Sequence, residues 1–230
     1  MDMSLRADAV LFDKDGTLFS FDESWSAWAR LFLDRMAGGD EARASRLAAA
    51  IGYDRSTGTF LPSSVAIAGT PEEVAALCAP VLGRAPEPLV DEINAAAAEA
   101  PMNEAVPLAP LLDRLRGAGL VLGVATNDAE TPARAHLAAV VDRFDFIAGS
   151  DSGWTPKPDP AMCRAFAGAV GVAPHRVVMV GDSLHDLRAG RAAGMQTVGV
   201  LTGPADESRI TKHADAVLRD IGQLPGWLGL

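Results

Sequence analysis

The chain has 230 residues, of which 49% are hydrophobic and 6% aromatic, and its formal net charge is -10 at pH 7. This hydrophobic content excludes a disordered chain, and the length favours one large domain or a core with an inserted subdomain. The acidic balance argues against a nucleic acid or an anionic membrane as partner, because both bind basic surfaces.

The two cysteines, Cys78 and Cys163, lie far apart and outside any metal-type spacing. We expect both to be buried as small hydrophobic side chains in a reducing compartment. No stretch approaches the roughly 20 apolar residues that span a bilayer, and no long apolar segment precedes Asp13. The expected protein is soluble and cytoplasmic, with no membrane partner.

The first predicted element is a buried strand over residues 9–12, which ends at the turn formed by Asp15 and Gly16. Side chains alternate along a strand, so Asp13 and Asp15 start on the same side and Lys14 on the other. Two close carboxylates attract a hard divalent cation, and one can act as nucleophile while the other donates a proton. Taken alone, the pattern is as typical of a plain strand and turn.

Residues 19–100 show helical patterning and no clear strand. Trp25 and Trp28 follow Asp22, a candidate N-cap, and predict a helix that ends near Gly38, with the tryptophans in the core. A second helix is expected over 40–51. The segment Thr70-Pro71-Glu72-Glu73 predicts a helix start by its hydroxyl, proline and acids, and 88–99 predicts a further helix. The irregular stretch 52–69 is long for a bare connection.

From Pro107 onward, helices and strands alternate. Helices are predicted at 111–118, 132–140, 160–170 and 184–193, and strands at 120–126, 144–148, 177–181, 197–201 and 216–218. Repeated strand-helix units imply a parallel sheet that helices cover on both faces. Ligands of such sheets bind at the carboxyl ends of the strands, near a topological switch point.

Three further polar groups follow later strands. Thr126 and Asn127 offer a hydroxyl and backbone N–H groups to anionic oxygens, although alone they are typical of a helix cap. Lys157 is one of only three lysines, against 17 arginines, and its ammonium can neutralise a phosphoryl group and a carboxylate. Asp182 ends a strand and Asp186 lies one helical turn later, so both can reach one cation or simply cap the helix.

These groups occur in one order at four successive strand ends, and as a set they resemble the motifs of the haloacid dehalogenase-like superfamily. The matching motifs are Asp13-x-Asp15-Gly16-Thr17, Thr126-Asn127, Lys157 and Gly181-Asp182-Ser183-x-x-Asp186. The resemblance implies an α/β fold with a Rossmann-like, doubly wound parallel sheet, whose first strand lies between the strands that bear Thr126 and Asp182. It also implies an all-helical cap domain at 19–102, inserted between core segments 1–18 and 103–230.

Within the superfamily the chain is similar to the phosphoglycolate phosphatase-like branch. The resemblance implies Mg²⁺-dependent hydrolysis of a phosphate monoester, phosphoglycolate or a similar small metabolite, through an aspartyl-phosphate. Asp13 would be the nucleophile and Asp15 the general acid and base. The implied metal site comprises Asp13, the backbone carbonyl of Asp15, Asp182 and Asp186, and the implied phosphate site comprises Lys157, Thr126 and Asn127.

Related activities can be weighed against the residues. Dehalogenases of the family lack the second acid, so Asp15 counts against that reaction, and the chain has no cap lysine of the kind that phosphonatases use. A phosphomutase uses the same motifs and stays an alternative, as does a non-catalytic phosphate-binding regulator. The sequence leaves monomer and homodimer open.

Substrate recognition is expected from the cap. Tyr53, Arg55, Thr59 and Ser63 in the irregular stretch are the candidate specificity residues, with solvated loop positions as the equal alternative. His185 in the fourth motif is expected on the surface of the first turn of its helix, with contact to the substrate as the alternative.

Overall fold

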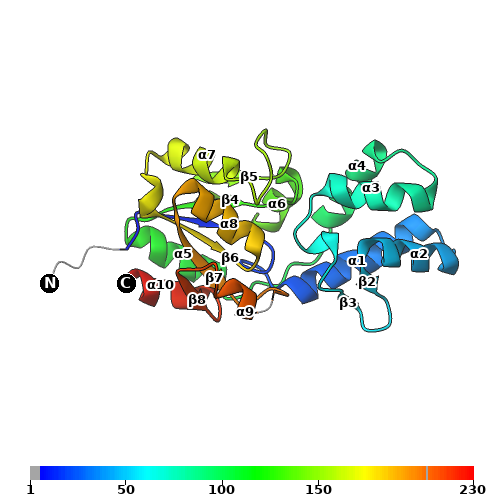
Figure 1. Cartoon of the computed structure of the whole chain (residues 1–230), viewed down its shortest axis with the longest axis horizontal. Helices are drawn as coiled ribbons and strands as arrows, with labels where there is room; N and C mark the ends of the chain where they lie inside the picture. Colours follow the sequence, from blue (N-terminus) through cyan, green and yellow to red (C-terminus); the bar gives the residue numbers. More distant parts are fainter. Residues whose placement is uncertain (1–5, 206) are drawn as a thin grey trace.

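The computed structural model describes residues 6–205 and 207–230, so residues 1–5 of the predicted first core segment lie outside the described part. Its main sheet has six parallel strands in the order β5-β4-β1-β6-β7-β8 (Figure 1). The strands are β1 (Ala9–Phe12), β4 (Val121–Ala125), β5 (Phe146–Ala148), β6 (Val177–Gly181), β7 (Gln196–Val200) and β8 (Ala216–Leu218). The predicted doubly wound sheet is confirmed, and β1 lies between β4 and β6 as expected.

Both faces of this sheet are buried under helices. Val10 and Phe12 of β1 point to the face covered by α5 (Leu108–Gly117) and α10 (Leu224–Leu228). Ala9 and Leu11 point to the face covered by α7 (Ala161–Val170) and α8 (Leu184–Ala193). A strand that is apolar at every position therefore fits the middle of the sheet, where each large side chain contributes about 1.5–3 kcal/mol on burial.

The remaining core elements are short. They are α6 (Glu130–His136), α9 (Glu207–Ile210) and single 3₁₀ turns at Val141–Arg143, Pro174–Arg176 and Ile221–Gln223. Cys163 lies on the buried side of α7, and Cys78 is buried in the helical region described next, so the predicted burial of both cysteines is confirmed. In the described part of the chain, no helix has the length and apolar character needed to cross a membrane.

Four of the helices between β1 and β4 pack around a hydrophobic core of their own, and we call them, together with the connecting residues 52–70, the cap. The four helices are α1 (Phe21–Ala37), α2 (Glu41–Ile51), α3 (Pro71–Leu82) and α4 (Glu87–Ala98). Trp28, Phe32, Leu47, Ile51 and Leu89 are among the side chains of this second core. Figure 1 shows the cap beside the sheet along the long axis of the molecule.

Local signals set most of the helix ends. Asp40 caps α2 by accepting a 2.9 Å hydrogen bond from the backbone N–H of Arg43. Thr70 and Glu73 form the expected capping box at the start of α3. The first helix differs from the prediction, because it begins at Phe21 after Ser20, and Asp22 lies inside its first turn, where an acid favours the positive end of the helix dipole.

The stretch 52–69 contains a small antiparallel hairpin of β2 (Tyr53–Asp54) and β3 (Thr59–Phe60), followed by a 3₁₀ turn at Val65–Ile67. The prediction of no strand in this region was wrong. The rings of Tyr53 and Phe60 pack at a centroid distance of 5.0 Å. This packing stabilises a hairpin in which each strand has only two residues. Strands of that length carry no readable period in the sequence.

Two connections join the cap to the sheet, and they lie side by side. The backbone N–H of Ser20 donates to the carbonyl of Asn103 at 2.8 Å, and that of Ala105 donates to the carbonyl of Leu18 at 2.9 Å. The cap therefore leaves the sheet immediately after the first acidic motif, and it sits over the carboxyl ends of the strands.

Candidate active site

Three strand ends bring the predicted site residues together. Asp13, Thr126 and Asp182 directly follow β1, β4 and β6. Phe12, the last residue of β1, is in register with Val124 and Val180 of the neighbouring strands. The chain passes to β4 and β5 on one side of β1 and to β6, β7 and β8 on the other, so this edge is the switch point at which open α/β sheets bind ligands.

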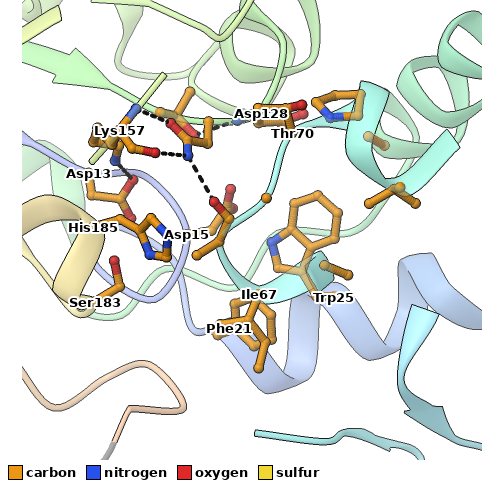
Figure 2. A pocket seen from close by; sticks show the side chains of 18 of the residues that line it. Asp13, Asp15, Phe21, Trp25, Ile67, Thr70, Asp128, Lys157, Ser183 and His185 are labelled. Carbon is orange, nitrogen blue, oxygen red and sulfur yellow. Dashed lines mark hydrogen bonds and ion pairs between the residues drawn. The ribbon is translucent and has the colours of Figure 1, made fainter. Parts of the chain in front are cut away.

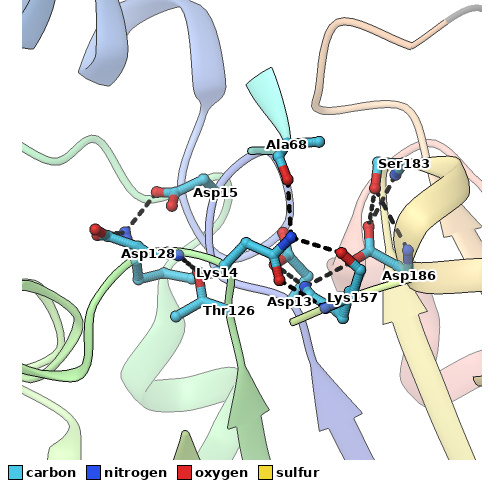
Figure 3. A network of polar contacts seen from close by, with 10 residues as sticks. Asp13, Lys14, Asp15, Ala68, Thr126, Asp128, Lys157, Ser183 and Asp186 are labelled. Carbon is cyan, nitrogen blue, oxygen red and sulfur yellow. Dashed lines mark hydrogen bonds and ion pairs between the residues drawn. The ribbon is translucent and has the colours of Figure 1, made fainter. Parts of the chain in front are cut away.

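Lys157 lies between two carboxylates at this edge (Figure 3). Its Nζ donates to Asp13 Oδ1 at 2.5 Å and to Asp186 Oδ1 at 2.6 Å, and the side chain is only 3% exposed. Burial alone would lower the pKa of Lys157, but the two carboxylates outweigh burial and raise the pKa. Burial raises the pKa of Asp13 to about 7, even though Lys157 acts in the opposite direction.

Asp182 completes an acidic cluster. One carboxylate oxygen each from Asp13, Asp182 and Asp186 lies within 4.8 Å of the others. Burial, and then repulsion from the other two acids, raises the pKa of Asp182 well above its ordinary value. Buried, mutually repelling carboxyl oxygens are the donor set that a hard divalent cation such as Mg²⁺ requires, so these residues fit such an ion.

Glycines leave the room that this cluster occupies. A Cβ at Gly16, where φ is +77°, would lie 2.5 Å from Asp182 Oδ2, and a Cβ at Gly203 would overlap the same carboxylate. The Gly16 carbonyl also accepts a 2.6 Å hydrogen bond from the Thr202 hydroxyl. The turn after Asp15 therefore needs glycine both for its positive φ and for its close approach to Asp182.

The carboxylate of Asp186 serves the helix and the site at once. Its Oδ2 accepts from the Ser183 backbone N–H at 3.0 Å and from the Ser183 hydroxyl at 2.6 Å, which begins α8 with a capping box. Its Oδ1 accepts from Lys157. The capping interpretation and the site interpretation of this motif therefore both hold, each on a different oxygen atom.

Asn127 positions Lys157 and connects the core to the cap. Its Nδ2 donates to the carbonyls of Lys157 and Ala68, each at 2.8 Å, and its Oδ1 accepts from the Lys157 backbone N–H at 2.9 Å. The Thr126 hydroxyl accepts from the Asp128 backbone N–H at 3.1 Å. The side-chain amide of Asn127 is thus occupied by protein partners, while the buried Thr126 hydroxyl lies at the end of β4 and lines the pocket described below.

A second buried lysine forms a network beside Asp15. Lys14 Nζ lies 2.6 Å from Asp15 Oδ1 and 3.3 Å from Asp128 Oδ2 (Figure 3). It also lies 3.0 Å from His136 Nδ1. The Nε2 atom of His136 lies 2.7 Å from the carbonyl oxygen of Ala97 in the cap. Burial, assisted by Lys14, lowers the pKa of His136 to about 4. The ring is therefore neutral at pH 7, and its partners assign acceptance to Nδ1 and donation to Nε2.

A pocket of about 630 Å³, its open mouth included, separates the acids from the cap (Figure 2). Its floor includes Asp13, Asp15, Thr126 and Lys157. The cap residues that line it are Phe21, Trp25, Trp28, Ala66, Ile67, Ala68, Gly69, Thr70, Pro71, Val74, Ile93 and Ala97. The site is therefore polar below and largely apolar above.

The sequence-predicted specificity residues lie elsewhere. Tyr53 is buried in the cap core, Arg55 pairs with Glu41 at 2.9 Å, and Thr59 and Ser63 are exposed on the hairpin side. None of these four is among the residues that line the pocket. The hairpin turns their stretch away from the acids, so the cap residues of the pocket wall replace them as candidates for substrate contact.

Sequence reasoning missed several residues of the site. Trp25 and Trp28 both line the pocket, and Trp28 also lies in the cap core as expected, stacked on Phe32 at 5.1 Å. His185 lines the pocket, which is the alternative position for it and not the favoured outer helix surface. Asp128 follows the second motif directly, so its position was a usable signal, whereas nothing in the sequence pairs His136 with Lys14.

The fold and the site together define a class of hydrolases. Its members have a Rossmann-like α/β core and a helical insert. An acid follows the central strand, an acid pair follows the strand that corresponds to β6, and a buried lysine lies between these acids. The chain belongs to the haloacid dehalogenase-like hydrolase family, whose model matches residues 7–194. The resemblance inferred from the four motifs is thereby confirmed.

Two curated relatives share one name. The chain is 39% identical to the phosphoglycolate phosphatase of Rhodospirillum rubrum over 121 residues, which are 52% of this chain and 50% of that protein. It is 34% identical to the phosphoglycolate phosphatase of Escherichia coli K12 over 127 residues, which are 54% of this chain and 50% of that protein. The chain spans about half the length of the curated relatives it matches.

Solved structures share the fold over nearly the whole chain. A HAD phosphatase from Thermococcus onnurineus has a TM-score of 0.66 at 24% identity, covering 96% of this chain and 97% of that one. A HAD-superfamily hydrolase of subfamily IA, variant 1, from Geobacter sulfurreducens has a TM-score of 0.64 at 20% identity, covering 97% of both chains. At these identities the likeness shows the fold.

Proposed function

We propose that this protein is a phosphatase that hydrolyses a small phosphate monoester in a Mg²⁺-dependent reaction through an aspartyl-phosphate on Asp13. The observation that carries the proposal is the convergence of Asp13, Lys157, Asp182 and Asp186 on one point beneath a pocket. A nucleophilic carboxylate, a compact cation and further acids that can hold a metal are the parts that phosphoryl transfer from a monoester needs.

In the first step, a carboxylate oxygen of Asp13 attacks phosphorus in line, and the bond from phosphorus to the leaving oxygen breaks. Asp15 gives its proton to that oxygen, so the product leaves as an alcohol. In the second step, Asp15 takes a proton from water as the water attacks the phosphorus of the aspartyl-phosphate, which releases inorganic phosphate and restores Asp13. Lys157 and the Thr126 hydroxyl would stabilise the phosphoryl oxygens in both steps.

Asp13, Asp182, Asp186 and the backbone carbonyl of Asp15 would hold Mg²⁺. When bound, the ion supplies positive charge that offsets the repulsion among the carboxylates and the incoming phosphoryl group. Ser183 fixes one oxygen of Asp186, so only the other oxygen is left for Lys157 or the ion. The hydrogen bonds of Asn127 and His136 to cap carbonyls hold the cap over the site, where it excludes water before transfer.

Phosphate release from a panel of phosphorylated metabolites, with Mg²⁺ or with EDTA, tests the proposal. Phosphoglycolate is the first compound to include, because it is the substrate in the names of the curated relatives. We expect release only with metal, at kcat/KM on the order of 10⁴ M⁻¹s⁻¹ for a good substrate, and its loss in Asp13→Asn. Near-normal turnover by this variant would remove Asp13 as the nucleophile.

The same assay separates the alternatives. A phosphomutase would move labelled phosphate from one ester to a second acceptor without releasing it. A binding regulator would neither release nor transfer phosphate, although it would bind the anion. We propose a cytoplasmic enzyme, in line with two buried, free cysteines and no membrane-spanning helix among the described residues.

A further inference from the structure

The cap wall of the pocket has no charged side chain. Its twelve residues are aromatic, aliphatic or small, apart from the hydroxyl of Thr70, which caps α3. Phe21, Trp25 and Ile67 stand opposite the acids (Figure 2). Since the phosphoryl group must reach Asp13 on the floor, the leaving group of a substrate would lie against this apolar wall.

The cations on the core side are already paired. Lys157 lies between Asp13 and Asp186, and Lys14 lies beside Asp15 and Asp128. The one further basic side chain among the residues that line the pocket is His185, on the core side next to Asp186. A carboxylate on the leaving group would therefore meet an apolar wall and nearby acids instead of a free cation, and burying such a charge unpaired is costly.

Two polar atoms of the wall, the indole nitrogens of Trp25 and Trp28, lack a partner. Both Nε1 atoms are buried and make no hydrogen bond, but Trp28 belongs to the cap core, whereas the Trp25 side chain is only partly buried, so Trp25 is the candidate for ligand contact. Figure 2 shows the Trp25 nitrogen on the side of the ring that faces Asp15, toward the interior of the pocket. Buried indole N–H groups usually have an acceptor, so a donor left open in a pocket indicates a ligand oxygen at that place.

We propose that the substrate is a phosphate monoester with an uncharged leaving group that is largely apolar and carries a neutral oxygen, such as an ether, carbonyl or hydroxyl, opposite Trp25. This inference rests on the proposed phosphatase activity and narrows its substrate class. It disfavours phosphoglycolate, whose leaving group bears a carboxylate, although the curated relatives are named for that compound.

Charge selection is tested by comparing benzyl phosphate with phosphoglycolate, since both leave as alcohols. We expect kcat/KM to favour benzyl phosphate by at least about tenfold. Ile67→Arg, which adds a cation to the half-buried wall, should shift the ratio toward phosphoglycolate by about tenfold or more. Leu61→Arg is the matched control, because Leu61 is in the same stretch, is 48% exposed and does not line the pocket, so the ratio should stay unchanged.

The role of Trp25 is tested with 2-methoxyethyl phosphate and butyl phosphate, which differ by an oxygen in place of one methylene. Trp25→Phe keeps a ring and removes the donor. We expect this variant to shift the kcat/KM ratio toward butyl phosphate by about fivefold or more relative to the wild type. An unchanged ratio in a folded variant would overturn the assignment of Trp25 as the donor.

Failure of this inference differs from failure of the proposed function. If the wild type hydrolyses phosphoglycolate better than benzyl phosphate, the phosphatase stands and the uncharged substrate class is wrong. If no ester releases phosphate with Mg²⁺, the proposed function itself fails.

Discussion

Replacing Asp13 with Asn is expected to abolish turnover and, at the same time, to stabilise the protein in the absence of metal. Burial among other acids raises the pKa of Asp13 from 3.8 to about 7. A carboxyl group whose pKa is raised by folding holds its proton longer in the folded state, so the free energy of unfolding falls as pH rises from about 4 to about 7. At about 1.4 kcal/mol for each pKa unit, the charged group costs the metal-free fold up to about 4 kcal/mol above pH 7.

Asn keeps the shape of Asp and removes this cost, but it accepts a weaker hydrogen bond from Lys157. We therefore expect Asp13→Asn to raise the free energy of unfolding by about 2–4 kcal/mol near pH 8 in EDTA, measured by urea denaturation. Near pH 5, where the folded wild type is mostly protonated at this site, the gain should fall to less than about half.

Asp34→Asn provides the control. Asp34 is exposed on α1, so its replacement should change the free energy of unfolding by no more than about 0.5 kcal/mol at either pH. A loss of stability in Asp13→Asn near pH 8, or a gain of equal size near pH 5, would refute the electrostatic reasoning.

Three further outcomes are expected. Mg²⁺ should raise the Tm more near pH 7.5 than near pH 5.5. The pKa values of Asp13 and Asp182 are raised, so at the lower pH the ion must displace more protons from these carboxyl groups. Equal shifts of Tm in calorimetry would argue against this acid cluster as the metal site. Gly16→Ala should weaken Mg²⁺ binding by about tenfold or more in titration calorimetry, because its Cβ would displace the Asp182 carboxylate, and unchanged affinity would contradict the assigned contact. Asp40→Ala should cost about 1 kcal/mol in urea denaturation through loss of the α2 cap, with phosphate release unaffected.

Local patterns predicted much of the fold and the core of the site. The strand over residues 9–12, β6 and α8 have the predicted bounds, because apolar runs between turn signals can be read from neighbouring residues alone. The hairpin of β2 and β3 could not be predicted, because strands of two residues each are held together only by the packing of Tyr53 on Phe60.

The sequence by itself determined the parallel sheet with helices on both faces and the polar residues that meet at its edge. Parallel strands end at one edge, so the order of Asp13, Thr126, Lys157 and Asp182 along the chain was enough to predict that they meet. No contact between distant segments had to be known, because the topology of the sheet supplies it.

Only the tertiary structure decided what faces this chemistry. The pairing of Lys14 with His136, 122 residues away, and the orientation of Trp25 into the pocket depend on how the cap helices pack over the sheet. An apolar helix position looks the same in the sequence whether it faces a core or a pocket, since hydrophobic spacing records burial and not the partner. The apolar wall that we propose to select the substrate therefore became visible only when the cap was placed over the acids.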